Sequence, residues 1–521
     1  MKEFVLKTQV LIIGGGITGT GLARDLALRG VHCILVEKSD INAGASGANH
    51  GLLHSGARYV SNDPSAAVEC REEGDLLKRL GPHCIEKTGG LFVAVEGDDE
   101  QYIADFPSLC ARCGIPVHAM DITQARELEP ALSDKLIAAY RVEDATIDPF
   151  KLSLENIWQA QDLGTTLLRN TKVLGFDRDS SRITSARVVD TRTREEKRIE
   201  AEQVVNAAGA WSAEVASLAG IAINMVYSKG TLVVTLNRIT KHVVNRLRRP
   251  SNADILVPGG TVSLLGTTSV KIHSLEHVYP TTEEVDLIVE EESAMLPILK
   301  STRYVRAYAG VRPLVGSQNA GDTRAISRGF SLLDHERDGL KNFATITGGK
   351  FTTYRIMAEK TADLICARMG ISTPCLTRTE PLPSSSVCRW TETGMAPQQW
   401  IERHDPEDLL LCECEMVPQS AIDIIVSALE KRNDLADLVS IGLRSRIGKG
   451  PCQGTFCSFK IAAHLYDQGY LHTDEGVTSI REFLRERWRG QQPILWGSQL
   501  VQAELLEAVH CGLLCEELYS R

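Results

Sequence analysis

The sequence has no excess of positive charge, no long apolar run and no leader-like N-terminus. Its formal net charge of −10 argues against nucleic acid as the main partner, because phosphate backbones are bound through basic patches. No apolar run approaches the roughly 20 residues of a membrane-spanning helix. Residues 1–9 are charged and lead directly into a predicted strand, so no signal peptide is expected. Any membrane association is therefore expected to be peripheral or through a partner.

Disulfides and a second nucleotide loop are also not expected. The chain contains 14 cysteines, but without a signal peptide such thiols are more often reduced or metal-binding than paired. One G-x-G-x-x-G stretch is found, at Gly14–Gly19, whereas enzymes that pass electrons from NAD(P)H to FAD usually contain two. The composition, 43% hydrophobic and 24% charged, is that of a folded protein, and the length of 521 residues allows two to four domains.

The strongest local signal is TQVLIIGGGITGTGLARDLALRGVHCILVEK near the N-terminus. It predicts a buried strand, a glycine turn, a helix and a second strand that ends in Glu37, 23 residues after Gly14. Gly14 permits the tight turn, Gly16 lets backbone N–H groups approach a pyrophosphate, and Gly19 allows close helix–strand packing. The helix N-terminus attracts phosphate, and the acid can bind a ribose diol. The residues expected to bind a dinucleotide here are Gly14, Gly15, Gly16, Ile17, Thr18, Gly19, Glu37 and Lys38.

The alternative for this unit is a glycine-rich turn between core elements. An N-terminal fingerprint followed by further flavin-like stretches favours tightly held FAD over NAD. These stretches read GASGANHGLLHSGARYV, VVNAAGAW, YAGVRPLVG and TITGGKFTTYR. Small residues let the backbone pass close to a cofactor, and a helix N-terminus can stabilise an anionic reduced flavin. The further residues expected at the flavin are Ser46, Asn49, His50, Gly51, Leu53, Val173, Ala208, Gly209, Trp211, Gly310, Arg312, Gly349 and Lys350.

The polar residues of these stretches also have purely structural interpretations. An isolated arginine such as Arg58 or Arg312 is more often part of a surface salt bridge. Tyr59 alone is more often a core aromatic, and His50 or His54 alone is more often a loop or core residue. Their joint placement beside glycine-rich turns favours one common site.

The ordered set LLHSGARY, VVNAAGAW, GVRPL and GGKFTTYR resembles the FAD-dependent glycerol-3-phosphate dehydrogenase family over roughly residues 8–370. With four C-terminal cysteines added, the chain resembles the large FAD subunits of the anaerobic members over nearly its full length. The resemblance implies that Arg58, Arg312 and Lys350 line the substrate pocket, with Tyr59 beside them.

Two positions depart from the aerobic branch of that family. Leu232 stands where the aerobic branch has a histidine, and Ser269 stands where it has an aspartate. Since leucine cannot move a proton, another group must serve as the base, and His50 or His54 is the expected one.

The chemistry that these residues permit is the oxidation of a secondary alcohol. Such a reaction needs a hydride acceptor, a base for the hydroxyl proton and positive charge for the developing alkoxide. Two arginines and a lysine suit a phosphorylated substrate, because arginine grips phosphate through paired N–H groups while lysine acts as a point charge. The working hypothesis places Arg312 near the reacting oxygen and lets Arg58 and Lys350 hold the phosphate.

Four cysteines near the C-terminus form a second candidate site. Cys412 and Cys414 read C-x-C, and after 37 intervening residues Cys452 and Cys457 read C-x4-C. Four thiolates can hold a [2Fe–2S] cluster, which is the preferred interpretation. Structural zinc is the alternative, although zinc sites more often use C-x2–4-C pairs. Reduced, unconnected thiols are the third possibility.

The residues around the second cysteine pair support the cluster. Arg444, Arg446 and Lys449 would offset its negative charge, and Gly448, Gly450 and Gly454 would let backbone N–H groups approach the sulfurs. The segment resembles the small [2Fe–2S] domain of bacterioferritin-associated ferredoxin. A cluster on the same chain could take single electrons from reduced flavin and hand them to a partner subunit.

The expected fold is α/β. It combines an FAD-binding Rossmann-like domain of the glucose-oxidase/D-amino-acid-oxidase type, a mixed-sheet substrate domain and a small helical [2Fe–2S] domain. The expected ranges are 1–75, 150–225 and 300–370 for a discontinuous FAD-binding domain, 76–149 and 226–299 for the substrate domain, 371–404 for a Pro/Ser/Thr-rich linker, 405–468 for the [2Fe–2S] domain and 469–521 for the tail. The apolar helix in the tail is expected to pack on the core or bind a partner, with core packing preferred.

The resemblance implies oxidation of sn-glycerol 3-phosphate to dihydroxyacetone phosphate, with electrons passed through partner subunits to a quinone. The protein is then expected on the cytoplasmic side of the inner membrane, held there by membrane-anchoring and electron-transfer subunits. The alternatives are a flavin dehydrogenase of another small 2-hydroxy acid or secondary amino acid, an electron-transfer flavin subunit, and a zinc-stabilised scaffold.

Overall fold

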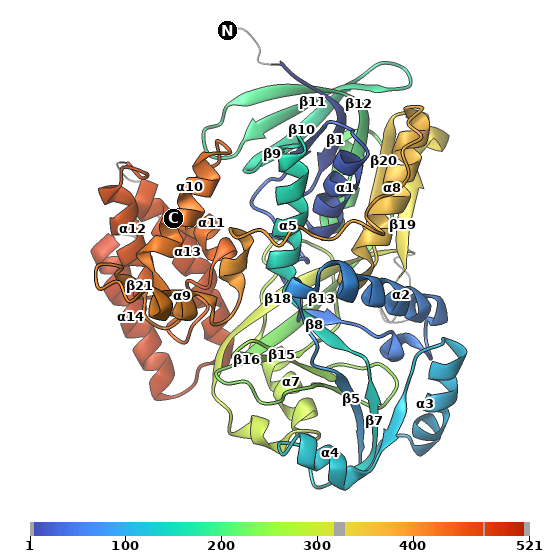
Figure 1. The fold of residues 1–521 in the computed structure, drawn as a ribbon, viewed down its shortest axis with the longest axis vertical. Coiled ribbons are helices and arrows are strands. Elements are labelled where there is room, and N and C mark those ends of the chain that lie inside the picture. The colour runs from blue at the N-terminus through green and yellow to red at the C-terminus, as the bar shows by residue number, and fades with distance from the viewer. Residues whose placement is uncertain (1–4, 317–328, 473–474, 515–521) are drawn as a thin grey trace.

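Two large sheets and a helical C-terminal region lie side by side in the computed structural model (Figure 1). The structure describes residues 5–316, 329–472 and 475–514. The α/β architecture that the sequence predicts, with a second mixed sheet and a helical C-terminal region, is confirmed.

The first sheet contains the N-terminal β–α–β unit. Its strands, in spatial order, are β10 (Thr171–Arg178), β11 (Ile183–Asp190), β12 (Glu196–Asn206), β1 (Val5–Ile13), β2 (Cys33–Val36) and β9 (Thr166–Leu168), with β20 (Phe343–Gly348) paired to β12 and β19 (Phe330–Asp334) paired to β20. The neighbours of β1 run parallel to it. The associated helices are α1 (Ile17–Leu28), α5 (Pro149–Asp162), α6 (Ser212–Leu218) and α8 (Tyr354–Arg368).

Alternate residues of β1 explain its central place in this sheet. Val10 and Ile12 pack in a cluster with residues of α1, α5 and α8. Leu11 and Ile13 pack in a second cluster with residues of β10 and β11. A strand buried on both faces is apolar without interruption, as this one is over its last four residues.

The second sheet is also mixed. Its strands, in spatial order, are β17 (Val270–Ile272), β13 (Met225–Thr235), β16 (Val262–Gly266), β15 (Ile255–Gly259), β14 (Val243–Arg246), β5 (Gly90–Val95), β7 (Leu136–Val142) and β6 (His118–Met120), with β18 (Tyr304–Val315) paired to β13. The helices within the same stretches of chain are α2 (Pro64–Leu80), α3 (Glu100–Arg112), α4 (Ile122–Leu128) and α7 (Thr282–Ser293). A small sheet joins β3 (Leu52–Leu53), β8 (Ala145–Ile147) and β4 (Ile85–Glu86).

The C-terminal region is mainly helical. Its elements are α9 (Met395–Arg403), β21 (Leu410–Cys412), β22 (Val417–Pro418), α10 (Gln419–Glu430), α11 (Leu438–Arg444), α12 (Cys457–Asp467), α13 (Glu475–Gln491) and α14 (Ser498–Leu514). Short 3₁₀ turns are η1 (Ala57–Tyr59), η2 (Pro82–Cys84), η3 (Gly209–Trp211), η4 (Pro297–Lys300), η6 (His335–Asp338), η7 (Phe351–Thr353), η8 (Cys388–Thr391) and η9 (Gln492–Ile494).

Two boundaries differ from the expected ranges. Strand β18 pairs with β13 in the second sheet, although the range 300–370 placed it with the FAD-binding domain. The stretch 371–404 is not simply a linker, because Trp390 is buried in the core of the C-terminal region. Phe483 of α13 lies in the same core, so this region extends beyond residue 468.

Buried ion pairs join the C-terminal region to the first sheet. Asp40 accepts from Arg169 at 2.5 Å and from Arg444 at 3.0 Å, and Arg169 also pairs with Asp434 at 2.6 Å. Burial raises the pKa of the Asp40 carboxyl, but the two arginines outweigh it and hold the pKa below its usual value. Arg444 therefore pairs with the flavin-side domain, and the expectation that it offsets the charge of a cluster is wrong.

Helix α14 lies largely in solvent, contrary to the preferred core packing. Val501, Leu505 and Leu513 are each more than 60% exposed, and the neighbouring Trp496 is 66% exposed. His510 is the buried exception among the described side chains of this helix. Within the described ranges, no helix is both long enough and apolar enough to cross a membrane.

Candidate active site

In the glycine loop between β1 and α1, the surrounding backbone leaves no room for a side chain at Gly14 or Gly19. Gly14 has a φ of 115°, and a Cβ atom there would lie 2.5 Å from the Ala207 carbonyl oxygen. A Cβ atom on Gly19 would lie 1.9 Å from the Gly14 carbonyl oxygen. Gly16 precedes α1 and has no side chain to cap it, so N–H groups at the start of the helix other than that of Ile17 are left for a phosphate.

Two side chains stabilise this loop. Glu37 accepts hydrogen bonds from the N–H groups of Gly15 at 2.7 Å and Ser39 at 2.9 Å. Burial raises the pKa of the Glu37 carboxyl, while these two donors lower it. The Ser46 hydroxyl accepts from the Ile17 N–H at 2.9 Å. The residues predicted for the ribose and the phosphates thus lie around one loop.

A second backbone segment approaches the same loop from the end of β12. The Ala207 N–H donates to the Ile13 carbonyl at 2.8 Å, which brings Ala208 and Gly209 beside the loop. Lys38 Nζ lies 3.7 Å from the centre of the Trp211 ring. These contacts bring the predicted residues of two distant segments together.

Val173 and Gly310, which were also predicted at the flavin, lie in two different strands. Val173 is a buried core residue of β10, and the N–H of Thr171 in the same strand donates to the Glu37 carbonyl at 2.8 Å. Gly310 lies in β18, where a Cβ atom would come 2.5 Å from the Ala48 carbonyl oxygen. A glycine is therefore needed where this strand crosses the segment that follows β2.

The predicted histidines, the tyrosine and the lysine form one cluster. The rings of His50 and His54 have their centres 6.0 Å apart. Tyr59 Oη lies 3.3 Å from His54 Nε2, and Lys350 Nζ lies 4.9 Å from the centre of the Tyr59 ring. The Asn49 side chain accepts from the Gly51 N–H at 2.7 Å and so shapes the backbone that carries both histidines.

Burial and surrounding positive charge keep the two histidines neutral. Burial is the main cause that lowers the pKa of His50 to about 3, followed by Arg312 and Arg58. Burial also lowers the pKa of His54, helped by His50, Arg58 and Lys350. All three predicted cations therefore act on this pair of rings, and the rings are available as proton acceptors.

Arg58 is held by an acid that the sequence analysis missed. Its guanidinium donates to Asp254 Oδ2 at 2.8 Å and to the Ser251 carbonyl at 3.3 Å. Arg248 donates to the other oxygen of Asp254 at 2.8 Å. Asp254 is fully buried. An acid directly before an apolar strand, in NADILVPG, was the available signal for it.

Arg312 reaches the site from β18. Its guanidinium donates to the Thr268 carbonyl at 3.2 Å and contacts the hydroxyl groups of Ser228 and Thr267. Gly230 on the paired strand makes room for it, since a Cβ atom there would lie 2.6 Å from the guanidinium. Backbone and hydroxyl acceptors thus fix the direction of this side chain.

Of the two departures from the aerobic pattern, Leu232 is buried and Ser269 is partly buried. Leu232 is buried in β13, and the hydroxyl groups of Ser269 and Ser228 lie 2.9 Å apart. Glu69 of α2 is a further missed candidate, because its Oε2 is buried without a hydrogen bond in the described part of the chain. Burial raises the pKa of this carboxyl, whereas Lys350 lowers it.

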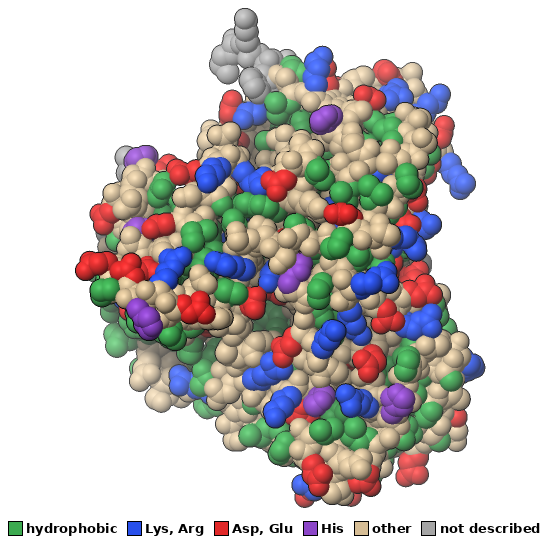
Figure 2. All heavy atoms as spheres, viewed as in Figure 1, with side chains coloured by type: hydrophobic (Ala, Val, Ile, Leu, Met, Phe, Trp, Pro, Cys, Tyr) green, Lys and Arg blue, Asp and Glu red, His purple; other side chains and the backbone are tan. Residues whose placement is uncertain are grey.

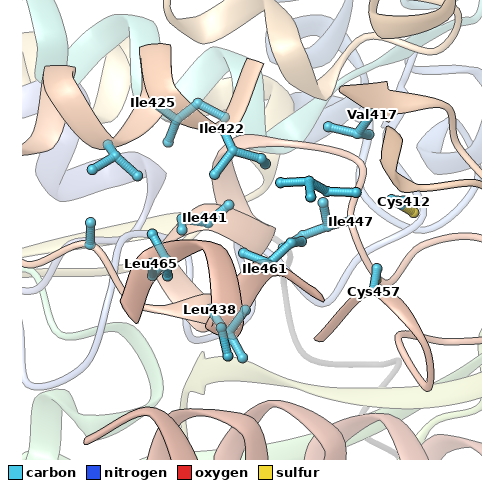
Figure 3. Packing of buried hydrophobic residues seen from close by; sticks show 14 of the residues in the cluster. Cys412, Val417, Ile422, Ile425, Leu438, Ile441, Ile447, Cys457, Ile461 and Leu465 are labelled. Carbon is cyan, nitrogen blue, oxygen red and sulfur yellow. The ribbon is translucent and has the colours of Figure 1, made fainter. Parts of the chain in front are cut away.

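The four C-terminal cysteines come together as two pairs. The Cys412 and Cys457 thiols interact: Cys457 is the main cause that raises the pKa of Cys412, and Cys412 is the main cause that lowers the pKa of Cys457. Burial is the main cause that raises the pKa of Cys452 to about 11, and the neighbouring Cys414 thiol raises it further. Figure 3 shows Cys412 and Cys457 at the edge of the apolar cluster.

Glycine backbone lies close to these cysteines. The backbone of Gly448 lowers the pKa of Cys457, that of Gly454 lowers the pKa of Cys452, and a Cβ atom on Gly450 would lie 2.5 Å from Cys414 Cβ. Among residues 5–316, 329–472 and 475–514, no three His, Cys, Asp or Glu side chains are arranged around a single metal ion.

Comparison with known proteins agrees with the predicted FAD-binding domain. A family model described as FAD dependent oxidoreductase (DAO) matches residues 9–364. The chain is 42% identical to the A-subunit of anaerobic glycerol-3-phosphate dehydrogenase from Escherichia coli (strain K12), over 97% of this chain and 96% of that protein. It is 39% identical to the protein of the same name in Haemophilus influenzae, over 98% and 93%.

A solved structure shows the same fold. The glycerol-3-phosphate dehydrogenase from Bacillus halodurans, complexed with FAD, aligns with a TM-score of 0.64 at 19% identity, over 94% of this chain and 96% of that one. Together with the family model, this confirms the predicted D-amino-acid-oxidase type of flavin domain. The chain belongs to the FAD-dependent oxidoreductases and, among them, to the A-subunit family of the anaerobic glycerol-3-phosphate dehydrogenases.

Proposed function

We propose that the protein oxidises sn-glycerol 3-phosphate to dihydroxyacetone phosphate, with bound FAD supplying the hydride acceptor. The observation that carries this proposal is the convergence of Arg58, Arg312 and Lys350 on the neutral pair His50 and His54. A phosphate monoester has close to two negative charges, which three cations can hold.

Arg58 and Lys350 bind the phosphate group in this proposal. Arg58 is suited to the task because Asp254 and the Ser251 carbonyl fix its orientation. Lys350 follows the Gly348–Gly349 turn and can approach as a point charge. Tyr59 lies between this lysine and His54 and keeps the lysine at the edge of the site.

Arg312 stabilises the negative charge that develops on the reacting oxygen, while His54 or His50 takes the hydroxyl proton. Both rings are neutral without substrate. The incoming phosphate adds negative charge and therefore raises their pKa towards the range of an efficient base. Tyr59 can orient His54 through its hydroxyl, which lies 3.3 Å from Nε2.

We assign the four cysteines to a [2Fe–2S] cluster, with zinc as the alternative. A [2Fe–2S] cluster contains two iron ions and four thiolates, and the observed pairs, Cys412 with Cys457 and Cys414 with Cys452, suit two ions better than one. The backbone of Gly448 and Gly454, which lowers the pKa of Cys457 and Cys452, suits anionic sulfur. When bound, such a cluster supplies one-electron transfer away from the flavin.

Partner subunits are the proposed destination of those electrons, with a quinone as the final acceptor. The relatives are named as one subunit of an enzyme, which supports an assembly of several chains. The exposed apolar side chains of α14 and Trp496 offer a surface for a membrane-anchoring or electron-transfer subunit. The protein would then lie on the cytoplasmic side of the inner membrane as a peripheral subunit.

The test is an anaerobic visible spectrum of the purified chain before and after addition of sn-glycerol 3-phosphate. Rapid loss of flavin absorbance supports the proposal. A flavin spectrum that this substrate leaves unchanged, but that a 2-hydroxy acid or a secondary amino acid bleaches, assigns the site to that substrate instead. A flavin that none of them bleaches indicates an electron-transfer subunit.

A further inference from the structure

The segment 266–269, which joins β16 to β17, contains the groups that direct Arg312. The Thr268 carbonyl accepts from the Arg312 guanidinium at 3.2 Å, and the Thr267 hydroxyl also contacts the guanidinium. The direction of this side chain therefore depends on where the segment lies. The contacts behind the segment thus bear on the site, although they do not reach it directly.

Helix α7 supplies two buried acids behind this segment. The helix packs on β13 and β16 (Figure 1). Figure 2 shows carboxylates spread over the molecular surface among lysines and arginines. Glu284 and Glu292 of α7 are instead only 8% and 0% exposed. Because buried carboxyl groups are costly unless they are hydrogen-bonded or paired, the contacts of these two acids are informative.

Glu292 holds the start of the segment. Its Oε1 accepts from the Gly266 N–H at 2.7 Å, which satisfies a buried backbone donor. Its Oε2 is buried without a hydrogen-bond partner among the residues that the structure describes. Burial raises the pKa of this carboxyl well above its ordinary value, although the Gly266 N–H lowers it. The uncharged form is therefore favoured, and a neutral amide of the same shape should accept this hydrogen bond equally well.

Glu284 holds the middle of the segment. Its Oε1 accepts from the Thr268 hydroxyl at 3.2 Å, and that hydroxyl accepts in turn from the Thr231 N–H at 3.0 Å. Lys229 Nζ lies 2.8 Å from Oε2 of Glu284, so the charge of this acid is paired. Thr268 is thus bonded to α7 and β13 through its hydroxyl, while its carbonyl accepts from Arg312.

We propose that Glu284 and Glu292 are positioning residues for the oxidation of the substrate. They fix the segment 266–269, and the segment directs Arg312 towards the reacting oxygen. Neither acid touches the substrate. The inference rests on the proposed function, because it concerns the arginine that acts in that reaction, and it extends the function by giving α7 a part in it.

Thr268→Val tests the contact with Glu284. The change removes the hydroxyl group at nearly constant shape, while the ion pair of Glu284 with Lys229 remains. It should lower kcat for sn-glycerol 3-phosphate at least tenfold, since small displacements of a group that stabilises the transition state are costly. KM should stay within threefold of that of the parent protein, because other cations hold the phosphate. Both constants are measured by dye-linked turnover of FAD-saturated protein under anaerobic conditions.

Thr231→Val is the matched control for this variant. Thr231 is 0% exposed and Thr268 is 1% exposed. The Thr231 hydroxyl donates to the same carboxylate, at 3.0 Å from Glu284 Oε2, but the residue lies in β13 and not in the segment. Its loss should leave kcat within twofold of the parent value.

Glu292 is tested by a pair of substitutions. Glu292→Leu removes the acceptor for the Gly266 N–H and should lower kcat at least tenfold, whereas Glu292→Gln keeps the acceptor and should keep kcat within threefold of the parent value. In an Arg312→Ala background, neither Thr268→Val nor Glu292→Leu should lower kcat more than twofold further, because the residue through which they act is absent. A merely structural role would lower kcat by the same factor in both backgrounds.

Several results would overturn the inference alone. They are an unchanged kcat or a change in KM only for Thr268→Val, an equal loss for Thr231→Val, a loss for Glu292→Gln as large as that for Glu292→Leu, or a full further loss in the Arg312→Ala background. If Glu292→Leu does not fold, Thr268→Val and its control decide the question. If the substrate does not bleach the parent flavin, or if Arg312→Ala stays active, the proposed function fails first and the inference fails with it.

Discussion

Arg312→Ala should reduce kcat/KM for sn-glycerol 3-phosphate by about 10²–10³, equivalent to roughly 2.7–4 kcal/mol, the usual loss when one donor to a developing oxyanion is removed. The guanidinium is directed by the Thr268 carbonyl at 3.2 Å and by the hydroxyl groups of Ser228 and Thr267.

The assay is dye-linked turnover under anaerobic conditions, with the flavin content measured from its absorbance. FAD should stay bound, because Arg312 lies outside the glycine loop. Arg303→Ala removes an exposed arginine just before the same strand and serves as the matched control. Added guanidinium should restore part of the activity of Arg312→Ala. A kcat/KM within threefold of the parent protein would refute the role given to Arg312.

Three further results are expected. Gly19→Ala should purify without FAD, because its Cβ atom would lie 1.9 Å from the Gly14 carbonyl oxygen, whereas Gly512→Ala meets nothing within 4 Å; equal flavin-to-protein absorbance ratios would contradict this. Cys457→Ser should lose protein-bound iron while Cys113→Ser keeps it, and unchanged iron in both would argue against the cluster. Because burial lowers the pKa of His50 to about 3, only the unfolded chain takes up this proton between pH 6.5 and 3. Stability should fall as the pH drops, by about 1.4 kcal/mol per pH unit for this group. In urea unfolding at pH 7 and 5, His50→Gln should lose less stability than the parent protein, and an equal loss would contradict the assignment.

The sequence was sufficient for the features that depend on local pattern. The β–α–β unit at the N-terminus, its glycine turn and Glu37 follow from spacing and steric requirements within about 30 residues of chain. The close approach of Ala208 to the loop was also predictable, because small residues after a buried strand permit such an approach. The spacing of the four cysteines also predicted a shared cluster site, and this stays a prediction.

Features that depend on distant partners could not be predicted in the same way. Asp254 holds Arg58 across 196 residues, and Asp40 holds Arg444 across 404 residues; no local periodicity records such pairs. Strand β18 belongs to the second sheet because it pairs with β13 there, although the chain that follows β18 enters the flavin domain. The solvent-exposed position of α14 was also missed, since an apolar helix is ordinarily buried.

The buried pairs of Asp40 with Arg169 and Arg444 have a consequence for how electrons can leave the flavin. Many redox proteins place a carrier on a swinging domain that visits donor and acceptor in turn. Here the C-terminal region is joined to the first sheet by buried ion pairs. Separating these pairs would leave unpaired charges in the protein interior, which is energetically costly. Under the proposed assignment of the flavin and the cluster, the separation between them would be set when the chain folds. Electron transfer between them would then not depend on solvent viscosity.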